Sequence, residues 1–231
     1  MILSDLFLAS RINQHWVTSG IDSIKDCLNK QHFLNYPHKV EYHYNSRGFR
    51  DAEWPETIKE LQNAIWCVGD SFTVGIGSPY EFTWPQVLAK ATGRRCINVS
   101  MDGASNTWIS RRARQIIHEI NPTHMVVLWS YIHRREFPNV NIPDEDRTMH
   151  FDKSNSELDD FKDFINCYNN LKNCTASTNI FTGIIPQPGL PTPESVGIMA
   201  LTKLDYARDY HHFDCITSEF FVKQILKHFD H

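Results

Sequence analysis

A regular alternation of short apolar runs and amphipathic helical patterns begins at Ile65 and continues to the end of the chain. The apolar runs have the length and the turn-forming flanks of buried β-strands. They lie at 65–68, 96–99, 125–129 and 179–185. The segments with one apolar helical face lie at about 83–92, 106–120, 154–171 and 217–229. Because strand–helix–strand units join parallel strands, the pattern predicts an α/β fold with a mainly parallel sheet and helices on both faces.

Polar residues at the predicted helix ends indicate where two of the helices begin. Thr83 with Gln86 three residues later fits a capping box, and Gly93 fits the C-terminal stop of the same helix. Ser154 with Glu157 is the corresponding capping pair for the helix that ends near residue 171.

Residues 1–63 do not follow this rhythm. They contain a helix-like stretch at 21–30 and many aromatic residues, and no flexible linker separates them from the rest of the chain. We therefore expect 1–63 to form an N-terminal extension, or cap, packed on a main domain at 64–231. Two loops rich in turn-forming residues are expected at 137–152 and 186–197, and the second is either a lid or a connector.

Charge and hydropathy exclude several classes of partner. The formal net charge is −4, and no long block of Lys or Arg suggests a nucleic-acid surface. We interpret Arg111, Arg112 and Arg114 as a solvated helix face. No apolar run approaches the ~20 residues needed to span a bilayer. The segment Met1–Ala9 carries Asp5 and lacks a basic start, which is atypical of a signal peptide, so we expect a cytoplasmic protein, or a bacteriophage or virion protein released by lysis.

The cysteines and glycines indicate no metal or nucleotide site. The chain has six cysteines, but no Cys-x-x-Cys and no metal-like Cys/His spacing, which is typical of a reducing compartment. Cys67 and Cys96 fall in strand-like runs and are expected to be buried thiols. Gly75 and Gly77 are not followed by the Gly-Lys-Ser/Thr of a phosphate loop, and they do not match a dinucleotide fingerprint.

Ser71 is the first candidate catalytic residue. It belongs to Gly69-Asp70-Ser71-Phe72, directly after the first clear strand. A serine at the open edge of a parallel sheet can supply both a nucleophile and a backbone oxyanion donor. The alternative is a serine that only caps the following turn.

A base for such a serine is available before the last helix. A serine hydroxyl is a weak nucleophile at neutral pH and needs a base of the histidine type. Asp209 and His212 have the spacing at which a carboxylate can accept the Nδ1–H of the imidazole and fix its tautomer. His211 lies in the same loop but lacks this spacing to Asp209.

The segment Asn98–Asn106 follows the second strand and contains Gly103. A glycine there permits close backbone approach, and its N–H can point at a substrate oxyanion. The alternative is an ordinary connection between a strand and a helix.

The three segments described above, taken in their order along the chain, resemble the sequence blocks of the SGNH (GDSL) hydrolases. Gly69-Asp70-Ser71-Phe72-Thr73-x-Gly75 resembles the first block, Asn98–Gly103 the second, and Asp209-x-x-His212 the last. The segment Asn45–Asp51 also resembles one that often precedes the first block. The resemblance covers about 45–229. It implies a flavodoxin-like three-layer α/β/α fold and ester hydrolysis through an acyl-Ser71 intermediate. It also implies an oxyanion hole that includes the N–H groups of Ser71 and Gly103, and no cofactor or metal.

The third block of that family, Gly-x-Asn-Asp, is missing after the third strand. Trp129 is followed there by residues 130–136, so the asparagine that usually donates to the oxyanion is absent. Losing one such donor typically costs ~2.7–4 kcal/mol of transition-state stabilisation. Either another donor replaces it, or activity is weak, or the transition state differs. The candidate replacements are Ser130, His133, Arg134 and Asn106.

Arg134 has two further interpretations. It can bind a carboxylate or phosphate of the substrate, or it can form a salt bridge with Glu136. The larger aromatic residues could stack on a sugar, but core or cap packing is the commoner role. They are Tyr42, Tyr44, Trp54, Trp84 and Trp108.

Three functional hypotheses remain at this point. The first is a serine esterase acting on short acyl esters, such as acetyl esters, or on an acylated carbohydrate. The second is an O-acyltransferase that uses the same triad and passes the acyl group to a sugar hydroxyl. The third is a non-catalytic binding or virion structural module on a hydrolase scaffold, a class that fold alone does not separate from the others.

Overall fold

The computed structural model describes residues 3–17, 40–136, 148–149, 156–174, 177–186 and 197–229. Its centre is a five-stranded sheet in the order β4-β3-β5-β8-β9, in which every neighbouring pair is parallel. The strands are β3 (Ile65–Gly69), β4 (Cys96–Ser100), β5 (His124–Trp129), β8 (Asn179–Ile184) and β9 (Met199–Ala200). The predicted parallel α/β fold is therefore confirmed. The two-residue strand β9 was not predicted, because it is too short to show a pattern.

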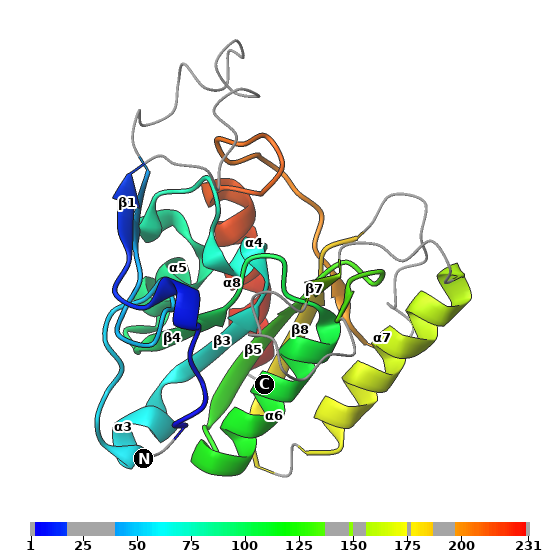
Figure 1. Cartoon of the computed structure of the whole chain (residues 1–231), viewed down its shortest axis with the longest axis horizontal. Coiled ribbons are helices and arrows are strands. Elements are labelled where there is room, and N and C mark those ends of the chain that lie inside the picture. Colours follow the sequence, from blue (N-terminus) through cyan, green and yellow to red (C-terminus); the bar gives the residue numbers. More distant parts are fainter. Residues whose placement is uncertain are drawn as a thin grey trace.

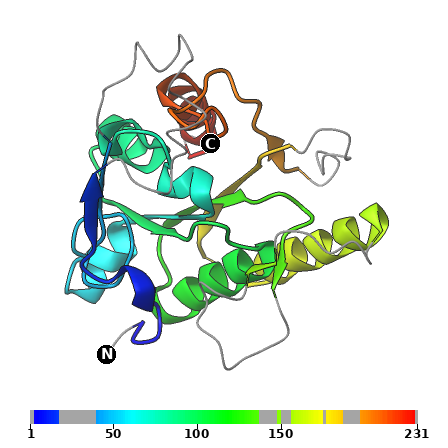
Figure 2. The same cartoon turned by 45° about the horizontal axis from the view of Figure 1, so that its top comes forward.

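Helices cover both faces of this sheet, as Figures 1 and 2 show. One layer contains α6 (Asn106–Ile120) and α7 (Glu157–Lys172), and the other contains α5 (Trp84–Thr92) and α8 (Cys215–Phe229). Alternate residues of β3 pack against the two helical layers. Trp66 and Val68 pack in the core on the α6 side, whereas Ile65 and Cys67 pack in the core on the α5 side. This period of two is the reason that the central strands read as continuous apolar runs.

The helix ends differ from two of the predictions. Thr83 is the N-cap of α5 and Gly93 its left-handed C-cap, but no capping box forms. The Thr83 hydroxyl accepts no hydrogen bond from the helix, and the Gln86 side chain donates to the Tyr80 hydroxyl instead. The predicted Ser154–Glu157 pair does not cap α7. The N-cap is Ser156, and its capping box is closed by Asp159. Both residues of a capping box lie on the surface, where several Ser/Thr–acid pairs fit one sequence pattern equally well.

The described part of residues 1–63 lies against the sheet domain. It contains the short helix η1 (Ala9–Arg11), a two-stranded antiparallel sheet of β1 (His15–Val17) and β2 (Glu41–His43), and α3 (Ile58–Asn63). The core on the α6 side includes Leu3, Leu6, Leu8 and Phe49. The predicted helix at 21–30 lies outside the described residues, and the division of the chain at residue 63 stays a prediction.

The large aromatic residues pack in the interior, as expected. Tyr42, Trp84 and Trp108 are fully buried, and Tyr44 is nearly so. Trp54 packs against the core. The thiols of Cys67 and Cys96 are also buried, as predicted.

The prediction of a solvated helix face for the arginines of α6 was wrong for Arg112. Arg114 is exposed, but Arg112 is buried, and Arg111 forms an ion pair with Glu136. Glu136 belongs to β6 (Arg135–Glu136), which pairs with β7 (Thr148–Met149) inside the segment expected to be a loop. The remainder of that segment and residues 187–196 lie outside the described residues. In the described part of the chain, no helix has the length and apolar character needed to cross a membrane.

Candidate active site

Ser71 lies at the carboxyl end of the central strand β3, as the first residue of the one-turn helix α4 (Ser71–Val74). The side chain of Asp70 caps this helix by accepting a hydrogen bond from Phe72 N at 3.0 Å. A Cβ on Gly69 would lie 2.1 Å from Thr73 Oγ1, so the tight turn between strand and helix requires glycine. The Ser71 N–H, at the start of a helix, has no acceptor within that helix.

His212 lies against Ser71, with Asp209 on the far side of its ring. The His212 Nε2 atom is 2.8 Å from Ser71 Oγ. The Nδ1 atom makes a short hydrogen bond with Asp209 Oδ2, while Asp209 Oδ1 accepts hydrogen bonds from the backbone N–H of His211 and His212. The spacing of the Asp209–His212 pair therefore folds into the geometry expected of an orienting carboxylate and a base.

The charge state of Asp209 follows from the same contacts. Burial favours the neutral acid, but the hydrogen bonds from His212 and the two backbone N–H groups outweigh it, so the pKa of Asp209 lies below its usual value. Asp209 is thus ionised at neutral pH and can stabilise a positive charge on the His212 ring.

Backbone contacts hold the loop that carries Asp209 and His212. Ala207 N donates to His212 O at 2.8 Å, which closes a tight turn with Tyr210 in the left-handed region at φ 61°. Arg208 N donates to Gly77 O, in the segment that follows α4. The loop is therefore attached to the element that also positions Ser71.

The loop with Gly103 begins beside Ser71. Met101 N donates to Gly69 O, and Ser100 of β4 is in register with Gly69 of β3. Gly103 is buried and has a positive φ of 72°, a conformation that favours glycine. The predicted second block therefore lies at the same sheet edge as the predicted nucleophile.

The segment 45–51, upstream of Ser71, supports the sheet edge at which Ser71 lies. Arg50 is buried and donates to the carbonyl oxygens of Val74, Gly75 and Ser78, which follow Ser71 in the chain. Asn98 in turn donates to Arg50 O at 3.3 Å. The segment 45–51, which the sequence analysis identified only by its resemblance to a family, therefore holds the turns after α4 in place.

Asn106 and Ser130, two of the candidate oxyanion donors, are engaged elsewhere. The Asn106 Nδ2 group donates to Ser130 O and Tyr131 O, and its Oδ1 accepts from Ser130 N at 2.9 Å. The Ser130 hydroxyl donates to Asp70 Oδ2 at 2.6 Å. Asn106 therefore fastens the start of α6 to the end of β5, and the hydrogen of the Ser130 hydroxyl is already used.

Arg134 lies beside Asp70. Its Nη1 atom is 3.7 Å from Asp70 Oδ2, and within the described residues it is a buried nitrogen with no hydrogen-bond partner. The interpretation of Arg134 as the salt-bridge partner of Glu136 is wrong, because Glu136 pairs with Arg111 at 2.9 Å. The remaining candidate, His133, stacks on the ring of Tyr131 with ring centroids 5.8 Å apart.

Three further residues complete the surroundings of His212, and of these Phe72 belongs to the sequence motif that contains Ser71. The Phe72 ring packs against the His212 ring, with centroids 4.6 Å apart. Lys203 Nζ donates to His211 O at 3.0 Å and lies 5.6 Å from the centre of the Phe72 ring. Tyr131 also packs edge-on against Phe72. Lys203 and Tyr131 carry no spacing signal, so only the folded chain identifies them.

The solved structures that resemble this chain include two carbohydrate esterases and a protein of the G-D-S-L family. A family two carbohydrate esterase from Clostridium thermocellum, in complex with cellohexaose, is 11% identical, with a TM-score of 0.50 over 84% of this chain and 67% of that one. A carbohydrate esterase whose active site displays divergent catalytic and non-catalytic binding functions is 14% identical, with a TM-score of 0.51 over 73% and 68%. A protein of the G-D-S-L family from Desulfitobacterium hafniense DCB-2 is 11% identical, with a TM-score of 0.49 over 72% and 99%.

No family profile matches the sequence, and no curated protein matches it. At these identities, the two carbohydrate esterases show the fold alone. They agree with the predicted three-layer α/β/α fold, in which a parallel sheet lies between two layers of helices.

Proposed function

We propose that this protein is a serine esterase in which Ser71 is the nucleophile and His212 the general base, oriented by Asp209. The observation that carries the proposal is the chain of contacts from Ser71 Oγ to His212 Nε2, at 2.8 Å, and from His212 Nδ1 to Asp209. A nucleophile, a base and an orienting group in hydrogen-bond reach of one another are the requirements of acyl transfer through an acyl-enzyme.

The reaction begins when His212 Nε2 takes the proton of Ser71 Oγ and the oxygen attacks the ester carbonyl. The tetrahedral intermediate collapses, the alcohol leaves with the proton from His212, and the acyl group remains on Ser71. Water then attacks the acyl-enzyme as His212 takes its proton, and the acid is released as Ser71 regains a proton.

The proposed oxyanion hole combines the N–H groups of Ser71 and Gly103 with Arg134. Asn106 and Ser130 are less suited to this role because their donors already have acceptors. Arg134 has an unused buried donor beside the residue that precedes Ser71. A guanidinium at this place would stabilise the negative charge that develops in the transition state, as the missing asparagine would.

The proposed substrate is a short acyl ester, such as an acetyl ester, or an acylated carbohydrate. The similarity to carbohydrate esterases, one of them bound to cellohexaose, supports this class. So does the stacked pair of exposed side chains Tyr206 and Tyr210, with ring centroids 5.2 Å apart, in the loop that carries Asp209. Exposed aromatic faces can pack against the apolar face of a sugar ring.

The test compares wild-type protein with Ser71→Ala in the hydrolysis of p-nitrophenyl acetate and in labelling by a fluorophosphonate, read by intact mass. We expect one label and measurable hydrolysis in the wild type, and neither in Ser71→Ala. The matched control is Ser110→Ala, because Ser110 is also buried but donates to Cys167 O between α6 and α7. The control should retain both activities.

Equal hydrolysis by the wild type and Ser71→Ala would refute the assignment of the nucleophile. A wild type that neither hydrolyses the ester nor takes the label would also overturn the proposal, in favour of a non-catalytic binding module. Hydrolysis that depends on Ser71 and rises when a sugar acceptor is added would instead indicate acyl transfer.

A further inference from the structure

The exposed face of the two-stranded sheet β1–β2 carries His15, Glu41 and His43. Each side chain offers a ligand atom, and these atoms all lie within 4.8 Å of one another. We propose that these residues bind a divalent transition-metal ion of the zinc type, at a site separate from Ser71. The proposal does not depend on the proposed esterase function.

The pairing of the strands places the three side chains on one face. His15 is directly opposite His43, and Trp16 is opposite Tyr42. Side chains alternate between the two faces of a strand, so Glu41 lies on the same face as His43. The exposure pattern agrees, since His15, Glu41 and His43 are exposed, whereas Tyr42 is fully buried.

The buried face of the same sheet fixes the backbone under these ligands. Trp16 stacks on Tyr42 and Tyr44, with ring centroids 5.9 and 4.9 Å apart. Arg50 donates a hydrogen bond to Glu41 O at 2.8 Å. The ligand-bearing positions are therefore held by packing and hydrogen bonds before any ion binds, which reduces the entropy lost on binding.

The separations fit one small ion. The His43 Nε2 and Glu41 Oε2 atoms are 3.2 Å apart. Two ligands of a tetrahedral zinc ion, at bonds of about 2.0–2.1 Å, are separated by roughly 3.3 Å. The rings of His15 and His43 stack with centroids 3.9 Å apart, so a small rotation of exposed side chains brings a His15 nitrogen to the same point. The ion would replace the His43–Glu41 hydrogen bond.

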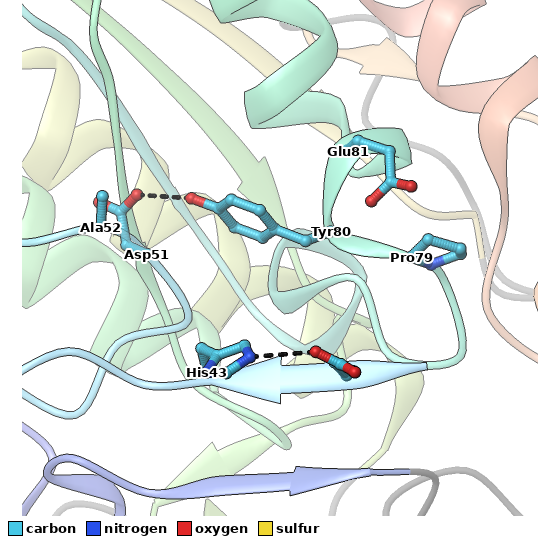
Figure 3. A pocket seen from close by; sticks show the side chains of 7 residues that line it. His43, Asp51, Ala52, Pro79, Tyr80 and Glu81 are labelled. Carbon is cyan, nitrogen blue, oxygen red and sulfur yellow. Dashed lines mark hydrogen bonds and ion pairs between the residues drawn. The ribbon is translucent and has the colours of Figure 1, made fainter. Parts of the chain in front are cut away.

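The surroundings favour a cation. Glu41 and His43 line a cavity of about 470 Å³ whose wall also includes Asp51, Tyr80 and Glu81 (Figure 3). Asp51 is engaged by Arg95 and by the Tyr80 hydroxyl, whereas Glu81 is an exposed carboxylate on the wall of the cavity. Carboxylates around a concave site raise the local concentration of cations, and the cavity leaves room for water as a fourth ligand.

Two imidazoles and one carboxylate suit Zn²⁺, Ni²⁺ or Cu²⁺. Mg²⁺ and Ca²⁺ prefer oxygen ligands alone. The ligands come from both strands, which are separated by residues 18–40 in the chain. A bound ion would therefore fasten β1 to β2. Because the unfolded chain does not hold His15 beside His43, binding also stabilises the folded protein.

The experiment titrates metal-free, full-length protein with ZnCl₂ by calorimetry and follows Co²⁺ binding by its visible absorption. We expect one ion per chain and a rise in Tm when Zn²⁺ is added. His15→Ala, His43→Ala and Glu41→Gln should each weaken binding by at least about tenfold, since even outer-shell partners of metal ligands contribute that much. Each should also lose most of the Tm shift.

The matched control is His118→Ala, which removes an exposed histidine from α6 and should leave Zn²⁺ affinity unchanged. Far-ultraviolet circular dichroism without metal checks that each variant is folded. The proposal is overturned if the wild type binds no Zn²⁺, or if binding persists at full affinity in the His15→Ala/His43→Ala double variant.

Discussion

The Nη1 atom of Arg134 lies 3.7 Å from Oδ2 of Asp70, the residue that precedes the proposed nucleophile. Complete burial raises the pKa of Asp70, while the positive charge of Arg134 and hydrogen bonds from Ser130 and Phe72 favour its ionised form. Arg134 thus supplies a positive charge beside a carboxylate that is removed from water. The same Nη1 atom has no hydrogen-bond partner among the described residues, which is why we propose it as an oxyanion donor.

Replacing Arg134 should therefore impair the chemical step. For Arg134→Gln we expect kcat to fall by about 10²–10³, the typical loss when one oxyanion donor is removed, with little change in KM. Steady-state kinetics with p-nitrophenyl acetate checks this. Arg111→Gln, which removes the ion pair with Glu136 away from Ser71, is the control. A fall in Tm with unchanged kcat would assign Arg134 to the support of Asp70 alone.

Asp209→Asn should retain the fold but lose most of the activity. The amide cannot hold the His212 ring in the required tautomer or stabilise its positive charge, and the corresponding change in a serine protease triad costs about 10⁴ in kcat. The measurement is kcat beside a circular dichroism spectrum. Asp102→Asn, in the exposed part of the loop before Gly103, is the control and should be fully active. Activity of Asp209→Asn within tenfold of wild type would remove Asp209 from the triad.

The dependence of stability on pH should also report on Asp209. Its pKa in the folded protein is below the ordinary value of 3.8, so the ionised form stabilises the fold at every pH above that value. This contribution is lost as pH falls through the lower, folded-state pKa. Urea unfolding between about pH 5 and pH 2 should therefore show the stability gap between wild type and Asp209→Asn shrinking toward acid. A gap that widens toward acid would contradict the assignment.

Arg50 should matter for stability more than an exposed arginine does. It is buried and donates to the carbonyl oxygens of Glu41, Val74, Gly75 and Ser78. An unsatisfied buried polar group costs about 1–3 kcal/mol, so Arg50→Met should lower the free energy of unfolding by more than about 3 kcal/mol. Urea denaturation measures this, with Arg114→Met on α6 as the control. Similar losses in the two variants would mean that water replaces the Arg50 hydrogen bonds.

The sequence alone determined the features that depend on local order. Apolar runs of strand length and amphipathic helical patterns identified the main strands and helices. The pair Asp209–His212 was recognisable because three residues within one loop suffice to bring a carboxylate to an imidazole. Ser71 was recognisable because the end of a buried strand is also the open edge of a parallel sheet.

Only the tertiary structure decided which distant side chains meet. The partner of Arg134 is Asp70 rather than its near neighbour Glu136, because the turn after β5 directs Arg134 toward the end of β3. The meeting of His15 with His43 depends in the same way on strand register. Contacts between residues far apart in the chain are set by the packing of whole helices and strands. A sequence pattern that spans one strand or one helix does not predict that packing.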